Sequence, residues 1–109
     1  NRNGPNARWE GWKIGTREGT DIRAIHHGRV VFSEWLRGFG LLIILDHGDG
    51  YLSLYAHNQT LLRDVGSWVN GGEIIATAGK SGGQPSAALY FEIRHKGQPQ
   101  DPAVWLKRG

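Results

Sequence analysis

The chain has 109 residues, no cysteine and a net charge of +3, from 13 lysines and arginines against 10 acidic residues. This length fits one domain around a single core, and the lack of cysteine excludes disulfides, thiolate metal sites and a cysteine nucleophile. The basic residues are scattered singly apart from Lys107-Arg108, whereas nucleic-acid binders concentrate them, so we expect no nucleic-acid partner.

Short apolar runs and frequent glycines limit the fold class. Leu41 to Leu45, for example, falls far below the roughly 20 apolar residues that a membrane helix needs, so we expect no membrane insertion. Seventeen glycines, several of them in pairs or in Gly-x-Gly turns, cut the chain into segments of strand length and leave no room for a long helix. The sequence therefore predicts an all-β, single-domain fold built on an antiparallel β-sheet.

The predicted elements follow in chain order. The first twelve residues are polar and contain glycine and proline, which is typical of an arm or an edge segment; we assign residues 1–8 to a polar N-terminal arm and residues 9–109 to the domain. Strands are predicted near residues 21–26, 28–35, 40–46, 51–57, 64–69, 73–78 and 88–95.

The central hairpin can be predicted in more detail. Asp49-Gly50 separates two strand-like runs and is a strong signal for a type I′ turn. If Gly48 pairs with Tyr51, Leu45 lies opposite Leu54, and the side chains divide between two faces. The expected core face holds Leu41, Ile43, Leu45, Leu52, Leu54 and Ala56. The other face, a candidate groove floor of mixed polarity, holds Leu42, Ile44, Asp46, Ser53, Tyr55 and His57.

The segment Ala-Ala-Leu-Tyr-Phe-Glu-Ile-Arg, residues 87–94, also alternates. Because strand side chains point to opposite faces in turn, Leu89, Phe91 and Ile93 are expected in the core. The other side carries Ala88, Tyr90, Glu92 and Arg94. Periodicity alone leaves two interpretations of that side open, namely a solvated strand face and the wall of a groove.

The sequence has none of the residue spacings that are typical of zinc sites or serine nucleophiles. A zinc site needs at least three converging ligands, usually His-x-His on a strand or His-x-x-x-His on a helix, and the five histidines offer neither spacing. A site assembled from distant segments, such as His57 with His47 or His26, stays open. Ser81 lies in a glycine-rich loop without the Gly-x-Ser-x-Gly elbow of a serine nucleophile.

Several short motifs follow one another in a characteristic order. They include Gly19-Thr20-Asp21-Ile22, Gly38-Phe39-Gly40, Asp46-His47-Gly48, Tyr55-Ala56-His57, Gly79-Lys80-Ser81-Gly82 and Leu89-Tyr90-Phe91-Glu92. Together they resemble the LytM domain of the M23 peptidase family, over residues 9 to about 105. The resemblance implies an antiparallel sheet of the duplicated hybrid-motif type with a groove across it.

The resemblance also indicates what this chain lacks. Active members hold zinc with His-x-Gly-x-Asp and with the second histidine of His-x-His-Phe-Glu. Here Trp9 and Lys13 occupy the first two ligand positions, while Ala88 and Tyr90 occupy the histidine pair. An indole nitrogen offers no lone pair and an ammonium repels a cation, so only His57, at the histidine of Tyr-Ala-His, is kept. The resemblance thus implies a degenerate domain with no catalytic residue, metal or other cofactor.

Within the family, the chain is most similar to degenerate LytM domains that activate periplasmic, zinc-dependent N-acetylmuramoyl-L-alanine amidases in cell division. The resemblance implies that an amidase regulatory helix docks in the vacated groove, that the domain has at most a weak contact with peptidoglycan, and that an upstream coiled coil links it to a division complex. Aromatic side chains with an arginine suit an amphipathic helix. The expected groove residues are Trp9, Lys13, Phe39, Leu42, Tyr55, His57, Tyr90 and Arg94. Trp35, Trp68 and Trp105 are assigned to packing.

Two alternatives to the activator stay open. In the first alternative, the chain is a zinc metallo-endopeptidase of peptidoglycan with unusual ligands. In the second, it is a module that binds peptidoglycan through its aromatic side chains. Bound zinc would identify the first alternative, and sedimentation with insoluble cell wall would identify the second.

Overall fold

The computed structural model describes residues 11–101, and all regular structure in that range is β-sheet. The strands are β1 (Trp12–Gly15), β2 (Asp21–Arg23), β3 (Gly28–Leu36), β4 (Gly40–Gly48), β5 (Tyr51–Leu61), β6 (Trp68–Val69), β7 (Ile74–Ala78), β8 (Ala88–His95) and β9 (Gln98–Gln100). They pair antiparallel in the order β1-β8-β5-β4-β3-β6, while β7 joins β5 to β2 and β9 pairs with β8. Across residues 11–101 there is no helix long and apolar enough to cross a membrane.

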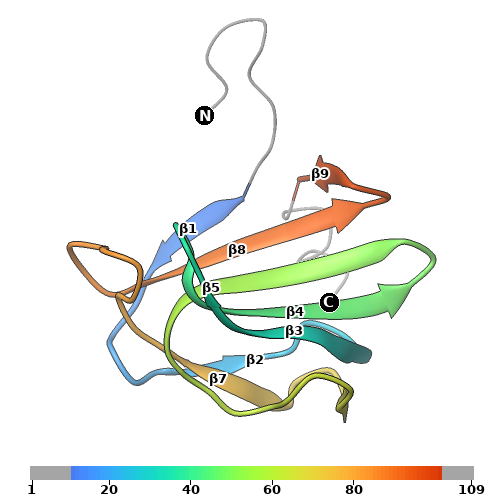
Figure 1. Ribbon diagram of the computed structural model, residues 1–109, viewed down its shortest axis with the longest axis horizontal. Helices are drawn as coiled ribbons and strands as arrows, with labels where there is room; N and C mark the ends of the chain where they lie inside the picture. Colours follow the sequence, from blue (N-terminus) through green and yellow to red (C-terminus); the bar gives the residue numbers. More distant parts are fainter. Residues whose placement is uncertain (1–10, 102–109) are drawn as a thin grey trace, which may run out of the picture.

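The long strand β5 belongs to two parts of the sheet. Up to Ala56 it pairs with β8, whereas from Asn58 onward it pairs with β7. The change falls at His57, a non-glycine residue with a φ of 66°, and the β4–β5 register shifts beside it. Irregularities of this kind bend a strand. Figure 1 shows the result: β1, β8, β5, β4 and β3 lie side by side, with β2 and β7 below them.

The predicted strands are all present, with some differences at their ends. β5 runs on beyond His57 to Leu61, and the segment predicted at 64–69 forms only the two-residue strand β6. β1 begins at Trp12, the end of the predicted arm or edge segment, and β9 was not predicted. A proline within a three-residue strand gave no usable sequence signal for β9.

The hairpin turn is confirmed, but the predicted register is wrong by one residue along most of β5. Gly48 does pair with Tyr51, and Asp49 and Gly50 have the positive φ values of 53° and 83° that a type I′ turn requires. A bulge between Asp46 and Gly48 adds one residue to β4, so Leu45 pairs with Ser53 rather than with Leu54. A slip of one residue exchanges the two faces of a strand, and β5 therefore presents the opposite side chains from those predicted.

The main core lies behind the sheet as viewed in Figure 1, between the sheet and β2. Its buried members are Ile22, Ala24, Val30, Ile43, Leu45, Tyr55, Val69, Ile75, Ala76, Ala78, Phe91 and Ile93, with Leu89 packed against them. The prediction that Leu89, Phe91 and Ile93 face the core is confirmed.

Two tryptophans assigned to packing are exposed instead. Trp35 is 57% exposed and Trp68 is 65% exposed. Trp35 lies near the tip of the β3–β4 hairpin, and Trp68 lies on the short strand β6 at the end of the sheet, where neighbouring strands give little cover. The assignment of Trp35 and Trp68 was therefore wrong, and Trp105 lies outside the described residues.

Candidate partner-binding face

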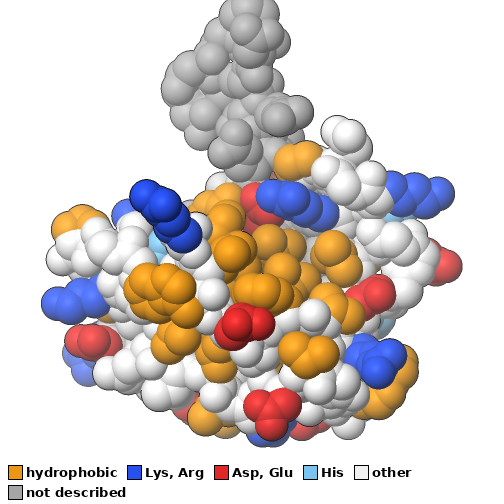
Figure 2. All heavy atoms as spheres, viewed as in Figure 1, with side chains coloured by type: hydrophobic (Ala, Val, Ile, Leu, Met, Phe, Trp, Pro, Cys, Tyr) orange, Lys and Arg blue, Asp and Glu red, His pale blue; other side chains and the backbone are white. Residues whose placement is uncertain are grey.

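A second apolar cluster covers the side of the sheet opposite the main core. Its buried members are Leu42, Leu54 and Ala56, and the partly buried side chains packed against them are Phe32, Phe39, Ile44, Leu52 and Tyr90. We call these eight side chains the apolar face. Figure 2 shows hydrophobic side chains gathered at the centre of this view, over the strands β8, β5, β4 and β3 of Figure 1. The outer layer of the apolar face is thus still partly open to water.

Cross-strand pairing explains why these side chains meet. One row runs from Glu92 through Leu54 and Ile44 to Phe32. The next row runs from Arg94 through Leu52 and Asp46 to Arg29. Directly paired residues share one face of a sheet, so the two rows lie side by side across four strands. Tyr90 extends the set, because it lies between Lys13 on β1 and Ala56 on β5.

A buried carboxylate holds the β8 border of the apolar face. The Tyr90 hydroxyl donates a hydrogen bond to Oε2 of Glu92 at 2.8 Å, and Nε of Arg94 donates to Oε1 at 2.6 Å. The Glu92 side chain is 3% exposed, whereas that of Arg94 is 39% exposed. Charge-assisted hydrogen bonds of this kind fix both partners, so Tyr90 and Arg94 are held in place at the surface.

His57 is buried beneath the apolar face and is held there by a hydrogen bond. Its Nδ1 lies 2.8 Å from the carbonyl oxygen of Ser81, which can only accept, so Nδ1 carries the hydrogen. The imidazole ring meets the Tyr90 ring edge-on at 6.2 Å, and the residue is 6% exposed. His57 therefore serves here as a buried support for Tyr90.

The β3–β4 hairpin brings Phe39 onto the apolar face. The Phe39 ring lies 6.1 Å from the Tyr90 ring, and the Phe39 carbonyl accepts a hydrogen bond from His57 N at 2.8 Å. Ser81 fastens the base of the hairpin, because its hydroxyl accepts from Leu41 N and donates to the Asn58 carbonyl. The hairpin, β5 and the 79–87 loop thus form one connected support for the aromatic side chains.

The predicted groove residues are brought together in part. Phe39, Leu42 and Tyr90 belong to the apolar face, His57 supports it from below, and Arg94 lies at its border. Lys13 is exposed on β1 directly opposite Tyr90. Trp9 lies outside the described residues. Their role in binding a partner stays a prediction.

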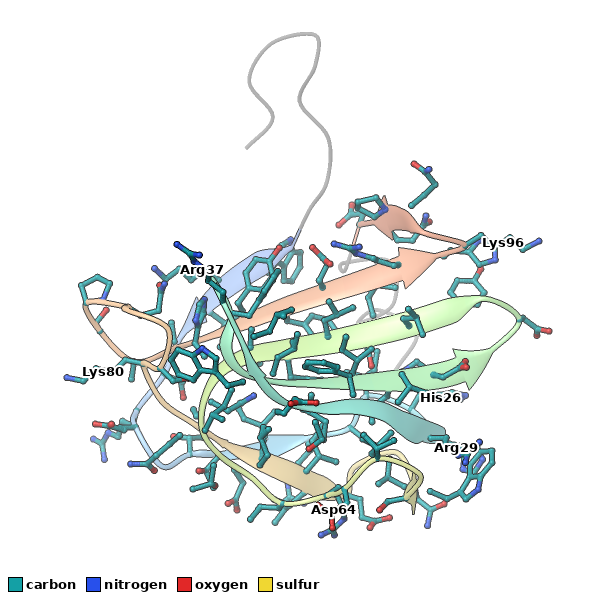
Figure 3. The ribbon with its side chains drawn as sticks, viewed as in Figure 1. His26, Arg29, Arg37, Asp64, Lys80 and Lys96 are labelled. Atoms are coloured by element: carbon teal, nitrogen blue, oxygen red, sulfur yellow. The ribbon has the colours of Figure 1, made fainter. Side chains whose placement is uncertain are left out.

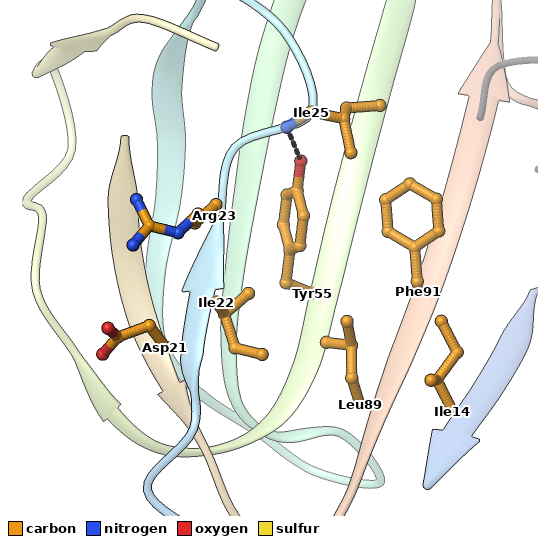
Figure 4. A pocket seen from close by; sticks show the side chains of 8 residues that line it. All are labelled: Ile14, Asp21, Ile22, Arg23, Ile25, Tyr55, Leu89 and Phe91. Atoms are coloured by element: carbon orange, nitrogen blue, oxygen red, sulfur yellow. Dashed lines mark hydrogen bonds between the residues drawn. The ribbon is translucent and has the colours of Figure 1, made fainter. Parts of the chain in front are cut away.

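Tyr55 was placed in the groove, and that placement is wrong. The one-residue slip of β5 turns Tyr55 into the main core, where it is 1% exposed. Its hydroxyl accepts a hydrogen bond from Ile25 N at 3.2 Å and is hydrogen-bonded to Ser53 Oγ at 2.8 Å. Burial raises the pKa of Tyr55 to about 12. Tyr55 lines a pocket of about 240 Å³ on this rear side. Figure 4 shows its side chain among the mostly apolar side chains that line the pocket, such as Phe91.

The described residues offer little to a metal ion. No three His, Asp or Glu side chains within residues 11–101 are grouped to hold one. His57 and His47 do not converge: Asp46, next to His47, pairs with Leu52, and His57 is five residues further along β5, roughly 16 Å away. His47 is also occupied, since its Nδ1 lies 2.9 Å from the His27 carbonyl and its Nε2 lies 2.7 Å from Ser53 Oγ. The alternative ligand set of His57 with His47 does not fit this geometry.

Sequence reasoning missed five contributors to this face. Four of them, Phe32, Leu52, Leu54 and Ala56, were not assigned to the groove, because the predicted register placed the three β5 residues in the core and no pattern tied Phe32 to the hairpin. Glu92 was recognised as a neighbour of Tyr90 but received no role, although it bonds both Tyr90 and Arg94. Its position between Tyr90 and Arg94 on the same face of a regular strand was the available signal.

The antiparallel sheet described above is that of a LytM-type domain. Residues 7–102 match Peptidase family M23, and the chain belongs to this family. The catalytic domain of the antimicrobial peptidase lysostaphin from Staphylococcus simulans superimposes with a TM-score of 0.84 and 29% identity, covering 96% of this chain and 84% of that domain's chain. The predicted all-β antiparallel fold and the predicted family are confirmed.

Two curated relatives are named as activators. The chain is 50% identical over 101 residues to the murein hydrolase activator EnvC of Escherichia coli, covering 93% of this chain and 24% of the relative. It is 46% identical over 98 residues to the murein hydrolase activator NlpD of the same species, covering 89% and 26%. The chain therefore spans about a quarter of the length of these relatives.

Proposed function

We propose that this chain is a non-catalytic activator of cell-wall hydrolysis, and that its targets are zinc-dependent N-acetylmuramoyl-L-alanine amidases. The names of EnvC and NlpD support activation of a murein hydrolase. The choice of amidases, action in cell division, a periplasmic location and an upstream coiled coil that links the domain to a division complex rest on the family resemblance. We extend the whole proteins' role to this chain, which covers about a quarter of each.

The apolar face supports docking of a helix from the amidase. Five of its eight side chains are only partly buried, and three of those, Phe32, Phe39 and Tyr90, are aromatic; the rings of Phe39 and Tyr90 lie 6.1 Å apart. An amphipathic helix binds such a surface through apolar residues spaced along one side. Held aromatic rings are favourable anchors, because they bury a large area at little cost in conformational entropy. This partly open, preorganised surface is the observation that carries the proposal.

The proposed lack of catalysis follows from the residues at the family's metal positions. Lys13 and Tyr90 are direct cross-strand neighbours, and Ala88 is buried beside them in β8. An ammonium and a phenol in place of a carboxylate and an imidazole give His57 no partner ligand there. On this proposal the amidase supplies all of the zinc chemistry.

Dye release from labelled peptidoglycan tests the proposal in three arms: this chain alone, a cognate amidase alone, and the two mixed. We expect release in the mixture well above the sum of the separate arms. Release by this chain alone would identify it as a hydrolase. The same release from the amidase with and without this chain would contradict activation.

Two further measurements test the alternatives. Elemental analysis after dialysis is expected to find less than about a tenth of a zinc per chain, whereas about one zinc per chain would favour a metallo-endopeptidase. Sedimentation with insoluble peptidoglycan, without any amidase, is expected to bring down little protein. Strong sedimentation together with no effect on the amidase would favour a peptidoglycan-binding module.

A further inference from the structure

The apolar face has borders of opposite charge. Lys13 on β1 and Arg94 on β8 lie along one border, and Glu34 on β3 and Asp46 on β4 lie along the other. Glu34 is paired with Leu42, a member of the apolar face, and is exposed. Figure 2 shows mostly basic side chains above the central hydrophobic patch and mostly acidic ones across its lower part, and Figure 3 labels Arg29 at the lower right, near the start of β3.

Neighbouring groups offset these charges only in part. Within residues 11–101, neither Lys13 nor Glu34 forms an ion pair. Arg29 is the cross-strand neighbour of Asp46, but its guanidinium lies against the Trp68 ring at 6.0 Å, and the Asp46 carboxylate accepts from Gly48 N. Glu92 offsets the positive charge of Arg94, so the exposed Lys13 supplies the net positive charge of that border.

The distance between the borders fits one helix. β8 lies three strand spacings from Glu34 on β3, about 14 Å, and two from Asp46 on β4, about 10 Å, and a helix with its side chains is about 10–12 Å wide. A helix that lies along the strands therefore covers the apolar centre and places one flank against each border.

We propose that the partner helix of the apolar face carries acidic side chains along one flank and basic side chains along the other. The acidic flank meets Lys13 and Arg94, and the basic flank meets Glu34 and Asp46. This inference rests on the proposed helix docking and adds the chemistry of the partner. It also fixes direction: turning the helix end for end exchanges its flanks, so only one of the two directions along the strands satisfies both borders.

Three synthetic helical peptides of 18 residues, sharing one leucine stripe, test the proposal. One has an acidic and a basic flank, one has two acidic flanks and one has two basic flanks. Binding to the whole chain is measured by titration calorimetry at low and at about 1 M salt. We expect the mixed peptide to bind about fivefold more tightly than the other two at low salt, and the difference to collapse at high salt, because exposed ion pairs are screened.

A matched pair of variants separates local from global charge. Glu34→Lys makes both borders basic, so the peptide with two acidic flanks is expected to become the tightest binder. Glu18→Lys makes the same change in net charge in the exposed β1–β2 turn, away from the apolar face. With this variant, the peptide with one acidic and one basic flank should still bind most tightly. Equal binding of all three peptides, or equal effects of the two variants, would overturn the charged borders and leave helix docking intact. Binding of none of the peptides would overturn helix docking as well.

Discussion

Nε of Arg94 lies 2.6 Å from a carboxylate oxygen of Glu92, a side chain that is only 3% exposed. The second oxygen of the same carboxylate accepts from the Tyr90 hydroxyl. The buried carboxylate of Glu92 therefore orients both Arg94, which lies at the border of the apolar face, and the ring of Tyr90, which belongs to that face. A buried carboxylate is costly unless it is fully hydrogen-bonded, so this arrangement ties the stability of β8 to the shape of the face.

Replacing Glu92 by glutamine should weaken both properties. An amide is uncharged and supplies one acceptor oxygen in place of two, so the charge-assisted bonds to Tyr90 and Arg94 are lost and we expect Glu92→Gln to lower the free energy of unfolding by about 1–3 kcal/mol in urea titrations. Glu73→Gln is the matched control, because Glu73 pairs with Arg63 at the surface, where a smaller loss is expected. Equal losses in the two variants would contradict the role given to Glu92.

Removal of the Tyr55 hydroxyl should affect stability alone. In Tyr55→Phe the Ile25 N–H loses its acceptor and Ser53 loses a partner, which should cost about 1–3 kcal/mol. Because Tyr55 lies in the main core behind the sheet, amidase activation by the folded variant should match that of the original chain. A selective loss of activation, measured well below the melting temperature, would return Tyr55 to the partner-binding site.

Tyr55 and Tyr90 differ in how well the sequence predicted the face of the sheet on which each side chain lies. β8 is regular, so simple alternation placed Tyr90 and Phe91 on the correct faces. β5 pairs with β4, which has a bulge beside His47. No residue type at that point indicates a bulge, so the same reasoning failed for Tyr55. The family and fold could be predicted because glycine turns and motif order survive such local shifts. The role of Glu92 required coordinates, since hydrogen bonds depend on side-chain geometry.

Gly40 tests the support of the Phe39 hairpin. Its φ is 68°, and a Cβ at this position would collide with Ser81 and with the Gly82 backbone. We expect Gly40→Ala to lower the free energy of unfolding by more than about 2 kcal/mol and to reduce activation. Gly38→Ala, in the same turn, has a φ of 89° but an open site, so it should show only the smaller cost of the backbone conformation. Similar losses in both variants would contradict the collision with Ser81.

His47 should make stability depend on pH. Burial, the largest cause, together with neighbouring His26 and His27 lowers the pKa of His47, while the His27 carbonyl and Asp46 act in the opposite direction. Since the folded pKa lies below the unfolded value of about 6.5, the unfolded chain binds the proton first. This contribution to stability is complete above about pH 6.5 and is lost as the pH falls towards the folded value.

Melting temperatures at pH 7.5 and pH 5.5 measure this dependence. The original chain should lose more stability over the interval than His47→Gln, which keeps hydrogen-bonding groups at this position but cannot titrate there. Every other residue is the same in the two proteins, so the difference between them reports on position 47. An identical pH dependence in the two proteins, or a steeper one in the variant, would contradict the lowered pKa of His47.

The most direct test of docking on the apolar face is amidase-dependent dye release with two variants of β8. Tyr90→Ala removes an aromatic anchor, and Arg94→Glu reverses the charge at the border. Arg17→Glu is the control, because it makes the same charge change at an exposed position in the β1–β2 turn. For variants that remain folded by circular dichroism, we expect at least about a tenfold loss of activation by Tyr90→Ala and by Arg94→Glu, with Arg17→Glu unaffected. Full activation by both β8 variants would contradict the account.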